Sequence, residues 1–295
     1  ATEIELDAAR KIDPKAELGD LVDVDVATKD FGRIAAQTAK QVIIQGIRES
    51  ERGMAYNEYS SREHEILNAT VFRVDPESGT IIVEVVSEGE KIETALAKGE
   101  QVPGEVLTEG QRIKVYVVEV RKGMHGPQIL LSRTHPGLVK RLFELEVPEI
   151  QSGIVQIKSI SREAGSRTKM AVHSTDPMID PVGSCVGPRG QRVDRVVAEL
   201  RGEKIDIIKW SADPAEFVAN ALNPAHAVNV FVNEQEKACR VVVPDNQLSL
   251  AIGKEGQNAR LAARLTGWKI DIKSQSQIDE QLAAEEEQPS ETAEE

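Results

Sequence analysis

The sequence predicts a multi-domain α+β protein in which one small domain occurs twice in the second half of the chain. The pattern Gly-x-x-Gly occurs at Gly187–Gly190 and again at Gly253–Gly256, and both copies are flanked by apolar segments in the same order. In the middle of the chain, short runs of alternating apolar and polar residues predict a small barrel of strands. A strongly acidic segment ends the sequence.

Residues 1–62 are predicted to form a partial helical element that ends in a long connecting helix. Leu21–Val26 alternates like a strand, and the segment from Asp30 to about Ser60 carries apolar residues along one stripe. Such a helix exceeds the usual three turns, which favours a connection between two bodies. The sequence begins at Ala1 without a methionine, so we interpret it as a fragment that lacks most of a preceding domain.

Residues 63–133 are predicted to form a five-stranded barrel. In the run Arg112–Val120 the inward-facing positions change phase after Val117, which predicts a β-bulge. Five short strands separated by turns over this length are typical of an OB barrel. The other predicted strands are Ile66–Val74, Thr80–Val86, a Glu-rich segment within Glu88–Glu100, and Gln128–Leu131.

OB barrels bind single-stranded nucleic acid by stacking bases on aromatic side chains above a basic groove. Phe72, Tyr116 and His125 are the candidates for that role here. Because this segment is rich in glutamate and has few aromatic residues, we expect only a weak RNA contact on the barrel. Packing inside the barrel is the alternative role for Phe72 and Tyr116.

Residues 134–210 and residues 211–274 share the order helix, strand, strand, helix, Gly-x-x-Gly loop, helix, strand. Nearly identical strands, Gly202–Ile207 and Gly267–Ile272, close the two copies. This order, with its additional helix at the front, resembles the prokaryotic form of the KH domain. The sequence therefore predicts two tandem KH domains with few residues between them.

A Gly-x-x-Gly loop that opens a helix is suited to binding an RNA phosphate. Glycine has no Cβ to block the approach, and the helix N-terminus supplies N–H donors and partial positive charge. A KH loop clamps about four nucleotides of a single strand, so the pair is expected to engage roughly eight or more. The residues expected to bind RNA are Gly187, Pro188, Arg189, Gly190 and Arg192 in the first copy and Gly253, Lys254, Glu255, Gly256, Gln257, Asn258 and Arg260 in the second.

The net charge of −13 is unevenly distributed along the chain. Residues 134–273 are slightly basic, whereas residues 275–295 contain Glu, Asp, Gln, Ala, Ser and Pro and no basic residue. This composition predicts a disordered acidic tail. The tail either keeps the chain soluble or competes with RNA for the basic loops.

The sequence contains no recognisable catalytic or metal-binding constellation. Its five histidines lack metal-ligand spacing, and neither a P-loop nor a Gly-x-Ser-x-Gly motif occurs. Cys185 and Cys239 are isolated in apolar segments and are predicted to be core thiols, which fits a reducing cytoplasm. No signal peptide and no apolar run of about 18 residues is visible. We therefore expect a cytoplasmic protein that is not an enzyme, takes no cofactor or metal, and does not associate with a membrane.

Three segments carry a more specific resemblance. Together with the order of connecting helix, barrel and tandem KH domains, they resemble the NusA family of bacterial transcription factors, whose barrel is of the ribosomal S-one type. The similarity is looser over residues 64–111, where that family has a glycine-rich barrel opening and a more apolar third strand. The three segments are Lys29–Val42, Gly126–Pro136 and Leu248–Arg260.

The resemblance implies a protein that binds single-stranded nascent RNA and RNA polymerase and acts with other Nus-type antitermination factors. In that family, the N-terminal part contacts the polymerase, whereas the barrel and KH domains hold the transcript. The implied activity is regulation of transcriptional pausing, termination and antitermination. Because only the last portion of the polymerase-binding part is matched, the polymerase contact is expected to be reduced.

Two alternatives belong to other functional classes. Polynucleotide phosphorylase also carries KH and S-one-type domains, but there a single KH domain precedes the barrel behind two large catalytic domains. The other alternative is a KH/OB accessory protein of an RNA-processing or ribosome-assembly machine. Such a protein is expected to carry basic tails, and this tail is acidic.

Overall fold

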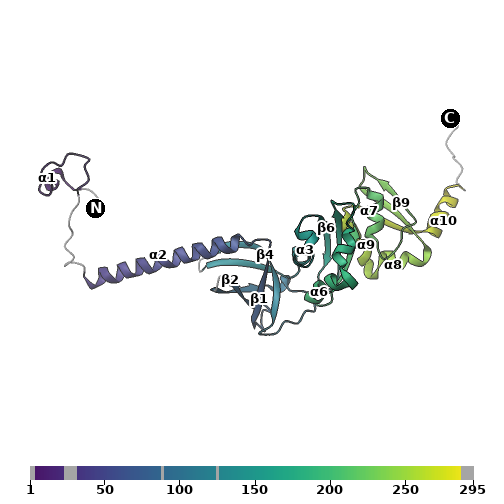
Figure 1. The fold of residues 1–295 in the computed structure, drawn as a ribbon, viewed down its shortest axis with the longest axis horizontal. Helices are drawn as coiled ribbons and strands as arrows, with labels where there is room; N and C mark the ends of the chain where they lie inside the picture. Colours follow the sequence, from purple (N-terminus) through teal and green to yellow (C-terminus); the bar gives the residue numbers. More distant parts are fainter. Residues whose placement is uncertain (1–3, 23–31, 88–89, 124–125, 287–295) are drawn as a thin grey trace, which may run out of the picture. The chain divides into compact units, whose positions relative to one another are not determined.

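The structure is a computed structural model that describes residues 4–22, 32–87, 90–123 and 126–286. The chain divides into two compact units, Ala1–Met54 and Ala55–Glu295. The second unit contains a five-stranded sheet, two three-stranded sheets and both Gly-x-x-Gly loops (Figure 1).

The first unit contains a short helix, α1 (Leu6–Ala9), and most of α2 (Arg33–Ser60), which spans 28 residues. The long helix predicted between Asp30 and Ser60 is therefore confirmed over its described part. Of the strand predicted at Leu21–Val26, only the first two residues are described, and neither belongs to a strand; the rest lies outside the described residues. No helix of the described chain is both long enough and apolar enough to cross a membrane.

The predicted barrel is confirmed as a nearly closed antiparallel sheet with the strand order β3-β2-β1-β4-β5. The two edge strands approach each other, and the Thr94 hydroxyl of β3 donates a hydrogen bond of 2.9 Å to the Ile129 carbonyl of β5. The register of β4 and β5 shifts between Val117 and Glu119, which confirms the predicted bulge. The strands are β1 (Ile66–Val74), β2 (Ile81–Ser87), β3 (Glu90–Leu96), β4 (Arg112–Gly123) and β5 (Gly126–Ser132).

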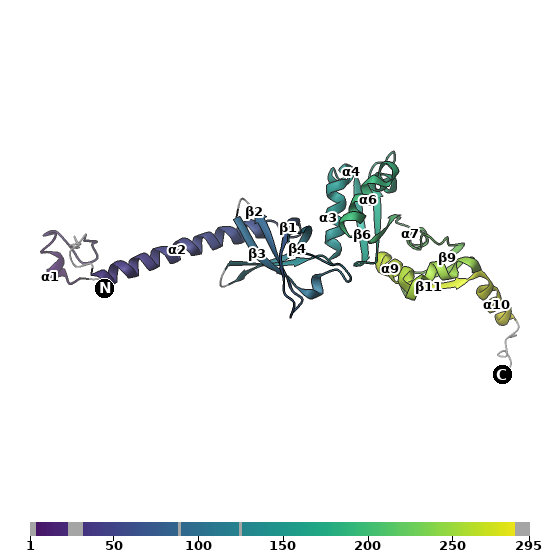
Figure 2. The ribbon, with the colours of Figure 1, turned by 90° about the horizontal axis from the view of Figure 1, so that it is seen from below.

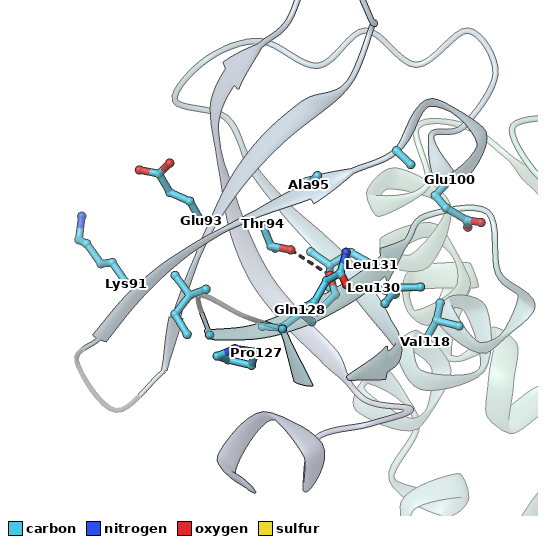
Figure 3. A pocket seen from close by; sticks show the side chains of 15 residues that line it. Lys91, Glu93, Thr94, Ala95, Glu100, Val118, Pro127, Gln128, Leu130 and Leu131 are labelled. Carbon is cyan, nitrogen blue, oxygen red and sulfur yellow. Dashed lines mark hydrogen bonds between the residues drawn. The ribbon is translucent and has the colours of Figure 1, made fainter. Parts of the chain in front are cut away.

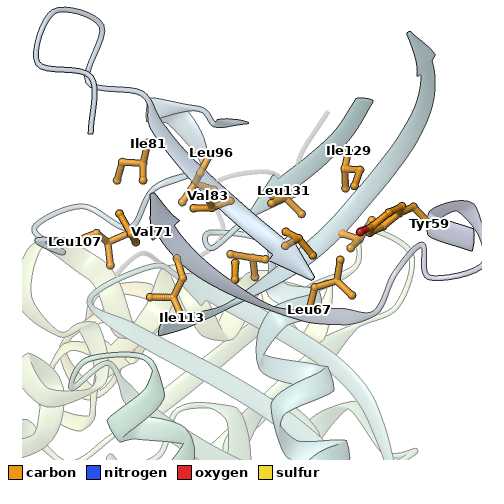
Figure 4. Packing of buried hydrophobic residues seen from close by; sticks show 14 of the residues in the cluster. Tyr59, Leu67, Val71, Ile81, Val83, Leu96, Leu107, Ile113, Ile129 and Leu131 are labelled. Atoms are coloured by element: carbon orange, nitrogen blue, oxygen red, sulfur yellow. The ribbon is translucent and has the colours of Figure 1, made fainter. Parts of the chain in front are cut away.

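Alternating residues of the strands fill the barrel. Val83 and Val85 on β2 and Val115 on β4 are completely buried, because the period of two places every second side chain on the inner face. Tyr59, near the end of α2, is 1% exposed and packs at one end of this cluster (Figure 4). The last turn of α2 is thereby part of the barrel core.

Each KH domain is a three-stranded sheet with helices packed against it. In the first, the strand order is β6-β7-β8, with β6 and β7 antiparallel and β7 and β8 parallel. Asp180 starts the helix before the loop by accepting hydrogen bonds from the N–H groups of Val182 and Gly183. The elements are α3 (Pro136–Glu146), α4 (Pro148–Gln151), β6 (Val155–Glu163), β7 (Arg167–Ser174), α5 (Pro181–Val186), α6 (Gln191–Glu199) and β8 (Lys204–Lys209).

The second KH domain repeats this arrangement with shorter elements. Its strand order is β11-β10-β9, with β10 parallel to β11 and antiparallel to β9. Asp213 caps the first helix by accepting from the N–H of Ala215, and Pro214 occupies the first helical position, as its fixed φ favours. The elements are α7 (Pro214–Ala221), β9 (Asn229–Asn233), β10 (Ala238–Val243), α8 (Leu248–Ile252), α9 (Gln257–Thr266) and β11 (Lys269–Ser274).

The acidic tail differs from its prediction in its first half. Residues Gln275–Glu286 form a helix, α10, where the composition predicts disorder. Its start is fixed by hydrogen bonds: the Ser274 hydroxyl accepts from the N–H of Gln277, and Asp245 accepts from the N–H and hydroxyl of Ser276. The remainder of the predicted tail, residues 287–295, lies outside the described residues.

A buried ion pair connects the end of β6 with the segment before β8 in the first KH domain. Arg162 on β6 and Glu203 before β8 have side chains 1% and 0% exposed, with 2.9 Å between Nη2 and Oε2. Glu203 also accepts hydrogen bonds from the Thr168 hydroxyl on β7 and from the N–H of Gly165 in the turn between β6 and β7. This carboxylate therefore joins all three strands of the sheet.

The same region ties the KH domain to the barrel. Arg162 donates to the carbonyl oxygens of Arg133 and His135, in the segment that leaves β5 and enters α3. Arg133 is itself fully buried and forms two hydrogen bonds, of 2.8 and 2.6 Å, to the carboxylate of Glu105. Arg133 also donates to the carbonyl of Glu199 at the end of α6. The barrel and the first KH domain thus share a continuous network of buried charges.

The two KH domains also pack against each other. Figure 2 shows α9 beside β6, and α9 contacts both β6 and β7. Glu163, the last residue of β6, accepts from Arg260 at 2.7 Å, from Arg264 at 2.6 Å and from Gln257 at 2.8 Å. These donors, Arg260 first, lower the pKa of Glu163 to about 2.

A second contact between the KH domains is largely buried. Lys169 on β7 has a fully buried side chain and donates to the carbonyl of Asn223, in the loop after α7, at 2.7 Å. Ala171 on β7 and Ile208 on β8 belong to the hydrophobic cluster of the second KH domain. Burial lowers the pKa of Lys169, and Asp206 at 3.1 Å opposes that shift.

Replacement of Glu203 by alanine is expected to lower the free energy of unfolding by about 3 to 5 kcal/mol, because Arg162 would remain buried without its counter-charge. Urea denaturation followed by circular dichroism measures this change. Replacement of the exposed Glu234 by alanine is the matched control and is expected to change stability by less than about 0.5 kcal/mol. Equal stability of the two variants would contradict the structural role of Glu203.

Replacement of Glu163 by glutamine is expected to destabilise the chain by about 1 to 2 kcal/mol at pH 7, a figure that allows for solvent screening of the half-exposed arginines. The pKa of this carboxyl is lowered from 4.5 to about 2 on folding, so its contribution is complete above about pH 4.5 and is lost as pH falls toward 2. The difference between wild type and variant, measured by denaturation from pH 7 to pH 3, is expected to shrink below pH 4.5. A difference independent of pH would refute this assignment.

Candidate nucleic-acid interface

The two Gly-x-x-Gly loops have the same backbone conformation. The first glycine has φ 74° and ψ 175° at Gly187, and φ 76° and ψ 172° at Gly253. The third residue is left-handed in both loops, with φ 52° at Arg189 and φ 53° at Glu255. Each loop leads directly into a helix, α6 in the first domain and α9 in the second. The sequence repeat therefore corresponds to a structural repeat at the level of single dihedral angles.

The first glycine of each loop is required by close contact as well as by its positive φ. An ideal Cβ on Gly187 would lie 2.6 Å from Cγ of Arg192. An ideal Cβ on Gly253 would lie 2.8 Å from both the Cβ and the backbone nitrogen of Asn258. Only glycine lets the loop fold back onto the first turn of the following helix.

The two middle residues of each loop point away from the protein. Pro188, Arg189, Lys254 and Glu255 are all exposed. A left-handed conformation costs a residue with a side chain about 1 to 2 kcal/mol, and such strain often occurs at ligand clamps. Within the described ranges, neither Arg189 nor Lys254 forms an ion pair or a side-chain hydrogen bond. Both positive charges are therefore free to meet a phosphate.

Arg192, which the sequence predicts to bind RNA, is already engaged within the first KH domain. It donates to the Glu149 carboxylate at 2.9 Å and to the Ser184 carbonyl at 2.6 Å. The next basic residue on this helix face, Arg195, pairs with Glu146 at 3.1 Å. These contacts connect α6 to the helices that precede it.

The helix residues of the second loop have similar internal roles. Gln257 and Arg260 bind Glu163 of the first KH domain, and Gln257 also donates to the Ser166 hydroxyl at 2.8 Å. Asn258 is buried, and its amide donates to the backbone carbonyl oxygens of Leu222 and Ala251. The structure thus places the predicted residues of each copy at its own loop and at the start of the following helix. In the second copy the middle residues of the loop are exposed, whereas Gln257, Asn258 and Arg260 form contacts inside the protein.

Sequence reasoning missed Glu163, which joins the two KH domains. An acidic residue at the end of a strand gives no local signal of its partners, which lie about a hundred residues away in the sequence. The basic faces of α6 and α9 are the one feature of the sequence that indicates acidic partners, because closely spaced arginines require counter-charges when another domain covers them. In the first copy these counter-charges come from Glu146 and Glu149 of the same domain.

The aromatic candidates for base stacking on the barrel differ in how far the structure exposes them. Tyr116 offers little surface on which a base could stack, because the residue is 6% exposed and belongs to the core of the first KH domain. It stacks on His135 with 4.7 Å between ring centroids, and it leaves no room for a Cβ on Gly137. Phe72 is 51% exposed, as a stacking platform requires. His125 lies outside the described residues.

A groove of about 940 Å3 follows the side of the barrel where β3 and β5 approach each other (Figure 3). Its charged lining residues are Lys91, Glu93 and Glu100, so carboxylates outnumber cations. Apolar side chains such as Val118 and Leu130 complete the lining. This charge balance does not favour an RNA phosphate, in agreement with the weak contact expected from the sequence.

The residues that the structure describes contain no group of three or more His, Cys, Asp or Glu side chains placed to hold a metal ion. Cys185 and Cys239 are both buried free thiols, which confirms their prediction as core residues. Burial raises the pKa of Cys185 to about 12, so this thiol stays protonated and unreactive near neutral pH.

Comparison with known proteins agrees with this domain order. Residues 1–53 match the family described as the NusA N-terminal domain, residues 133–210 the NusA-like first KH domain, and residues 214–280 the NusA-like second KH domain.

Curated relatives of this chain carry the name transcription termination/antitermination protein NusA. The protein from Bacillus subtilis is 58% identical over 93% of this chain and 72% of its own length. The relative from Halalkalibacterium halodurans is 57% identical over 94% of this chain and 71% of its own length. The relative from Thermus thermophilus is 45% identical over 97% and 73%, respectively. With this identity across all of its predicted domains, the chain belongs to the NusA family of transcription termination/antitermination proteins.

Proposed function

We propose that the chain regulates transcriptional pausing, termination and antitermination by holding single-stranded nascent RNA on its two Gly-x-x-Gly loops. The relatives named above are termination/antitermination proteins, and both KH domains match the forms found in that family. The loop residues are the proposed RNA contacts, and the helix residues Arg192, Gln257, Asn258 and Arg260 support the loops.

One observation carries the proposal: two loops of the same backbone conformation each expose an unpaired cation beside the N-terminus of a helix. Arg189 and Lys254 supply the cations, and the N-termini of α6 and α9 supply the positive end of the helix dipole. A phosphate at each loop would be attracted by the helix N-terminus and by one side chain. This arrangement recognises a nucleic-acid backbone without reading its sequence.

The preference for a single strand follows from the surroundings of the loops. A KH domain binds bases that are unstacked and lie along a half-apolar surface, so paired bases in a duplex cannot reach it. The half-buried Val193 on α6 and Ala259 on α9 follow the loops at equivalent positions. With about four nucleotides for each loop, the two domains would hold roughly eight or more.

The other proposed partners follow from family membership. RNA polymerase and other Nus-type antitermination factors are the proposed protein partners, and the cytoplasm is the proposed location. The match of residues 1–53 to the NusA N-terminal domain supports a polymerase contact in the first unit. Phe72 is the proposed, weaker RNA contact on the barrel, supported by its exposed ring.

Replacement of Pro188 and Arg189 by two aspartates, or of Lys254 and Glu255 likewise, is expected to weaken single-stranded RNA binding about tenfold or more. The new carboxylates would repel the phosphate, while aspartate tolerates the left-handed backbone of the third position. Fluorescence anisotropy with a labelled RNA of about 12 nucleotides and a duplex of the same sequence, over a salt series, measures the effect.

The matched control is the replacement of Glu236 and Lys237 by two aspartates. This exposed pair changes charge in the same way as Lys254 and Glu255, and Lys237 is also left-handed, with φ 47°. The control is expected to retain wild-type affinity. If both loop variants bind RNA as tightly as the control, the Gly-x-x-Gly loops are not the RNA contacts and the proposal fails.

A further inference from the structure

The outer face of each KH sheet is the face turned away from the helices of its own domain. In the second domain, α7, α8 and α9 pack on the inner face, where Val241 and Val243 of β10 belong to the hydrophobic cluster. Because side chains alternate along a strand, Arg240 lies on the outer face. The strand register places Phe231 of β9 and Asp271 of β11 beside Arg240, so these three residues form one row across the outer face.

The first domain has an equivalent row on its outer face. It consists of Ser161 on β6, Lys169 on β7 and Asp206 on β8, which the register pairs in the same order. Nζ of Lys169 lies 3.1 Å from Oδ2 of Asp206. In the second domain the corresponding distance, from Arg240 Nε to Asp271 Oδ2, is 3.6 Å. The internal repeat therefore includes a cation on the middle strand that pairs with an aspartate on the parallel strand.

In the first domain, this row is covered by helices of the second domain. Helix α9 packs on β6 and β7, and α7 packs on β8, so Ser161 and the Lys169 side chain are buried. The Lys169 ammonium donates to the carbonyl of Asn223, two residues after the end of α7, at 2.7 Å. Since the C-terminal end of a helix carries partial negative charge, this end of α7 suits the cation. The outer face of a KH sheet is thus a docking face for helices in this protein.

In the second domain, the equivalent row is exposed. Phe231 is 57% exposed, and the side chains of Arg240 and Asp271 are 57% and 55% exposed. A groove of about 630 Å3 runs along this row, and the half-buried Ile278 of α10 forms part of its wall. An exposed aromatic ring beside a groove with apolar walls is typical of a protein interaction site.

The charges of this groove favour a protein ligand over RNA. The lining contains two carboxylates, Glu236 and Asp271, and two cations, Arg240 and Lys269. It therefore has no excess of positive charge to attract phosphates. A second copy of this chain is also a poor ligand, because its helices α7 and α9 are already packed against its own first KH domain.

We propose that the outer face of the second KH sheet binds a helix of a partner protein, with the C-terminal end of that helix at Arg240 and one of its apolar side chains in the groove between Phe231 and Ile278. The contact repeats, with a separate polypeptide, the way in which α7 and α9 cover the first domain. A separate chain loses more freedom of motion on binding than a linked domain does, so it requires more apolar contact. Phe231 supplies that contact where the first domain has Ser161.

The test screens the full chain against a phage library that displays overlapping peptides of about 20 residues, long enough for roughly five helical turns. The peptides cover the proteome of Bacillus subtilis, the source of a relative 58% identical to this chain. Enriched peptides are synthesised, and their binding is measured by fluorescence anisotropy for the wild type, Phe231→Ala and Arg240→Ala. The matched controls are Leu145→Ala, an exposed apolar residue on α3, and Arg121→Ala, an arginine on β4 that is also 57% exposed and also paired with a carboxylate.

We expect enriched peptides that bind the wild type with a dissociation constant on the order of 10 μM and bind Phe231→Ala and Arg240→Ala about tenfold more weakly. The two controls are expected to bind as the wild type does. Circular dichroism is expected to show that the peptide becomes helical on binding. A benzophenone group on the last residue of the peptide is expected to crosslink to β10 or β11 near Arg240. Both substituted residues are exposed, so all five proteins are expected to melt at the same temperature.

The inference is overturned if no peptide is enriched, if the enriched peptides bind Phe231→Ala and Arg240→Ala as tightly as the wild type, or if they bind without becoming helical. Two further measurements assign the face to another ligand. Loss of single-stranded RNA binding in Phe231→Ala and Arg240→Ala, with no change in peptide binding, would make the face an RNA contact. A wild-type dimer that Phe231→Ala converts to a monomer in sedimentation equilibrium would make it an interface between two copies, and either result rejects the partner helix.

This inference is independent of RNA binding by the Gly-x-x-Gly loops. The aspartate variants of the two loops are expected to bind the enriched peptides as tightly as the wild type. Loss of RNA binding in those variants therefore leaves the peptide result unchanged, and failure of the peptide test leaves the proposed function unchanged.

Discussion

The buried carboxylate of Glu203 is the contact on which the position of the first Gly-x-x-Gly loop depends. It neutralises Arg162 and accepts hydrogen bonds from β7 and from the turn before it, while Arg162 holds the segment that enters from the barrel. A buried charge is tolerated only when its partners are complete, so these elements must assemble together. Since Glu203 comes directly before β8 and shortly after α6, its anchoring also fixes the helix that the first loop opens.

Features with a local cause could be predicted from the sequence. The strands of the barrel follow from a period of two, the bulge from a change of phase after Val117, and the loops from paired glycines at positions with positive φ. The five-stranded barrel and the two KH domains were therefore predicted correctly, including the order of their elements.

Features that depend on distant partners could not be predicted in this way. Tyr116 lies between Val115 and Val117, which fill the barrel, so it belongs to the outer face of β4, and there His135 and Gly137 at the start of α3 cover its ring. The sequence predicts that Arg260 binds a phosphate. In the structure Arg260 pairs with Glu163, because the two KH domains pack against each other. The helix α10 begins where a composition without aromatic residues predicts disorder, because Asp245 and Ser274 supply caps that composition does not reveal.

The local arrangement of charge explains how a chain with a net charge of −13 can bind RNA. Glu163 occupies Arg260 and Arg264, and Glu149 occupies Arg192, so most of the basic helix residues are neutralised by near neighbours. The unpaired cations of the two loops remain as small positive areas. Since exposed charges further apart than about 10 Å are screened at moderate salt, the total charge of −13 has little influence at the loops.

The network around Arg133 bears on how this protein can evolve. The buried Arg133 side chain takes its counter-charge from Glu105 in the barrel, and the Arg133 carbonyl accepts a hydrogen bond from Arg162 in the first KH domain. Any separation of these two domains would therefore leave a buried charge without its partner. Recombination at that boundary would leave unmatched charges in both halves. The barrel and the first KH domain are therefore expected to be exchanged between proteins only as one block.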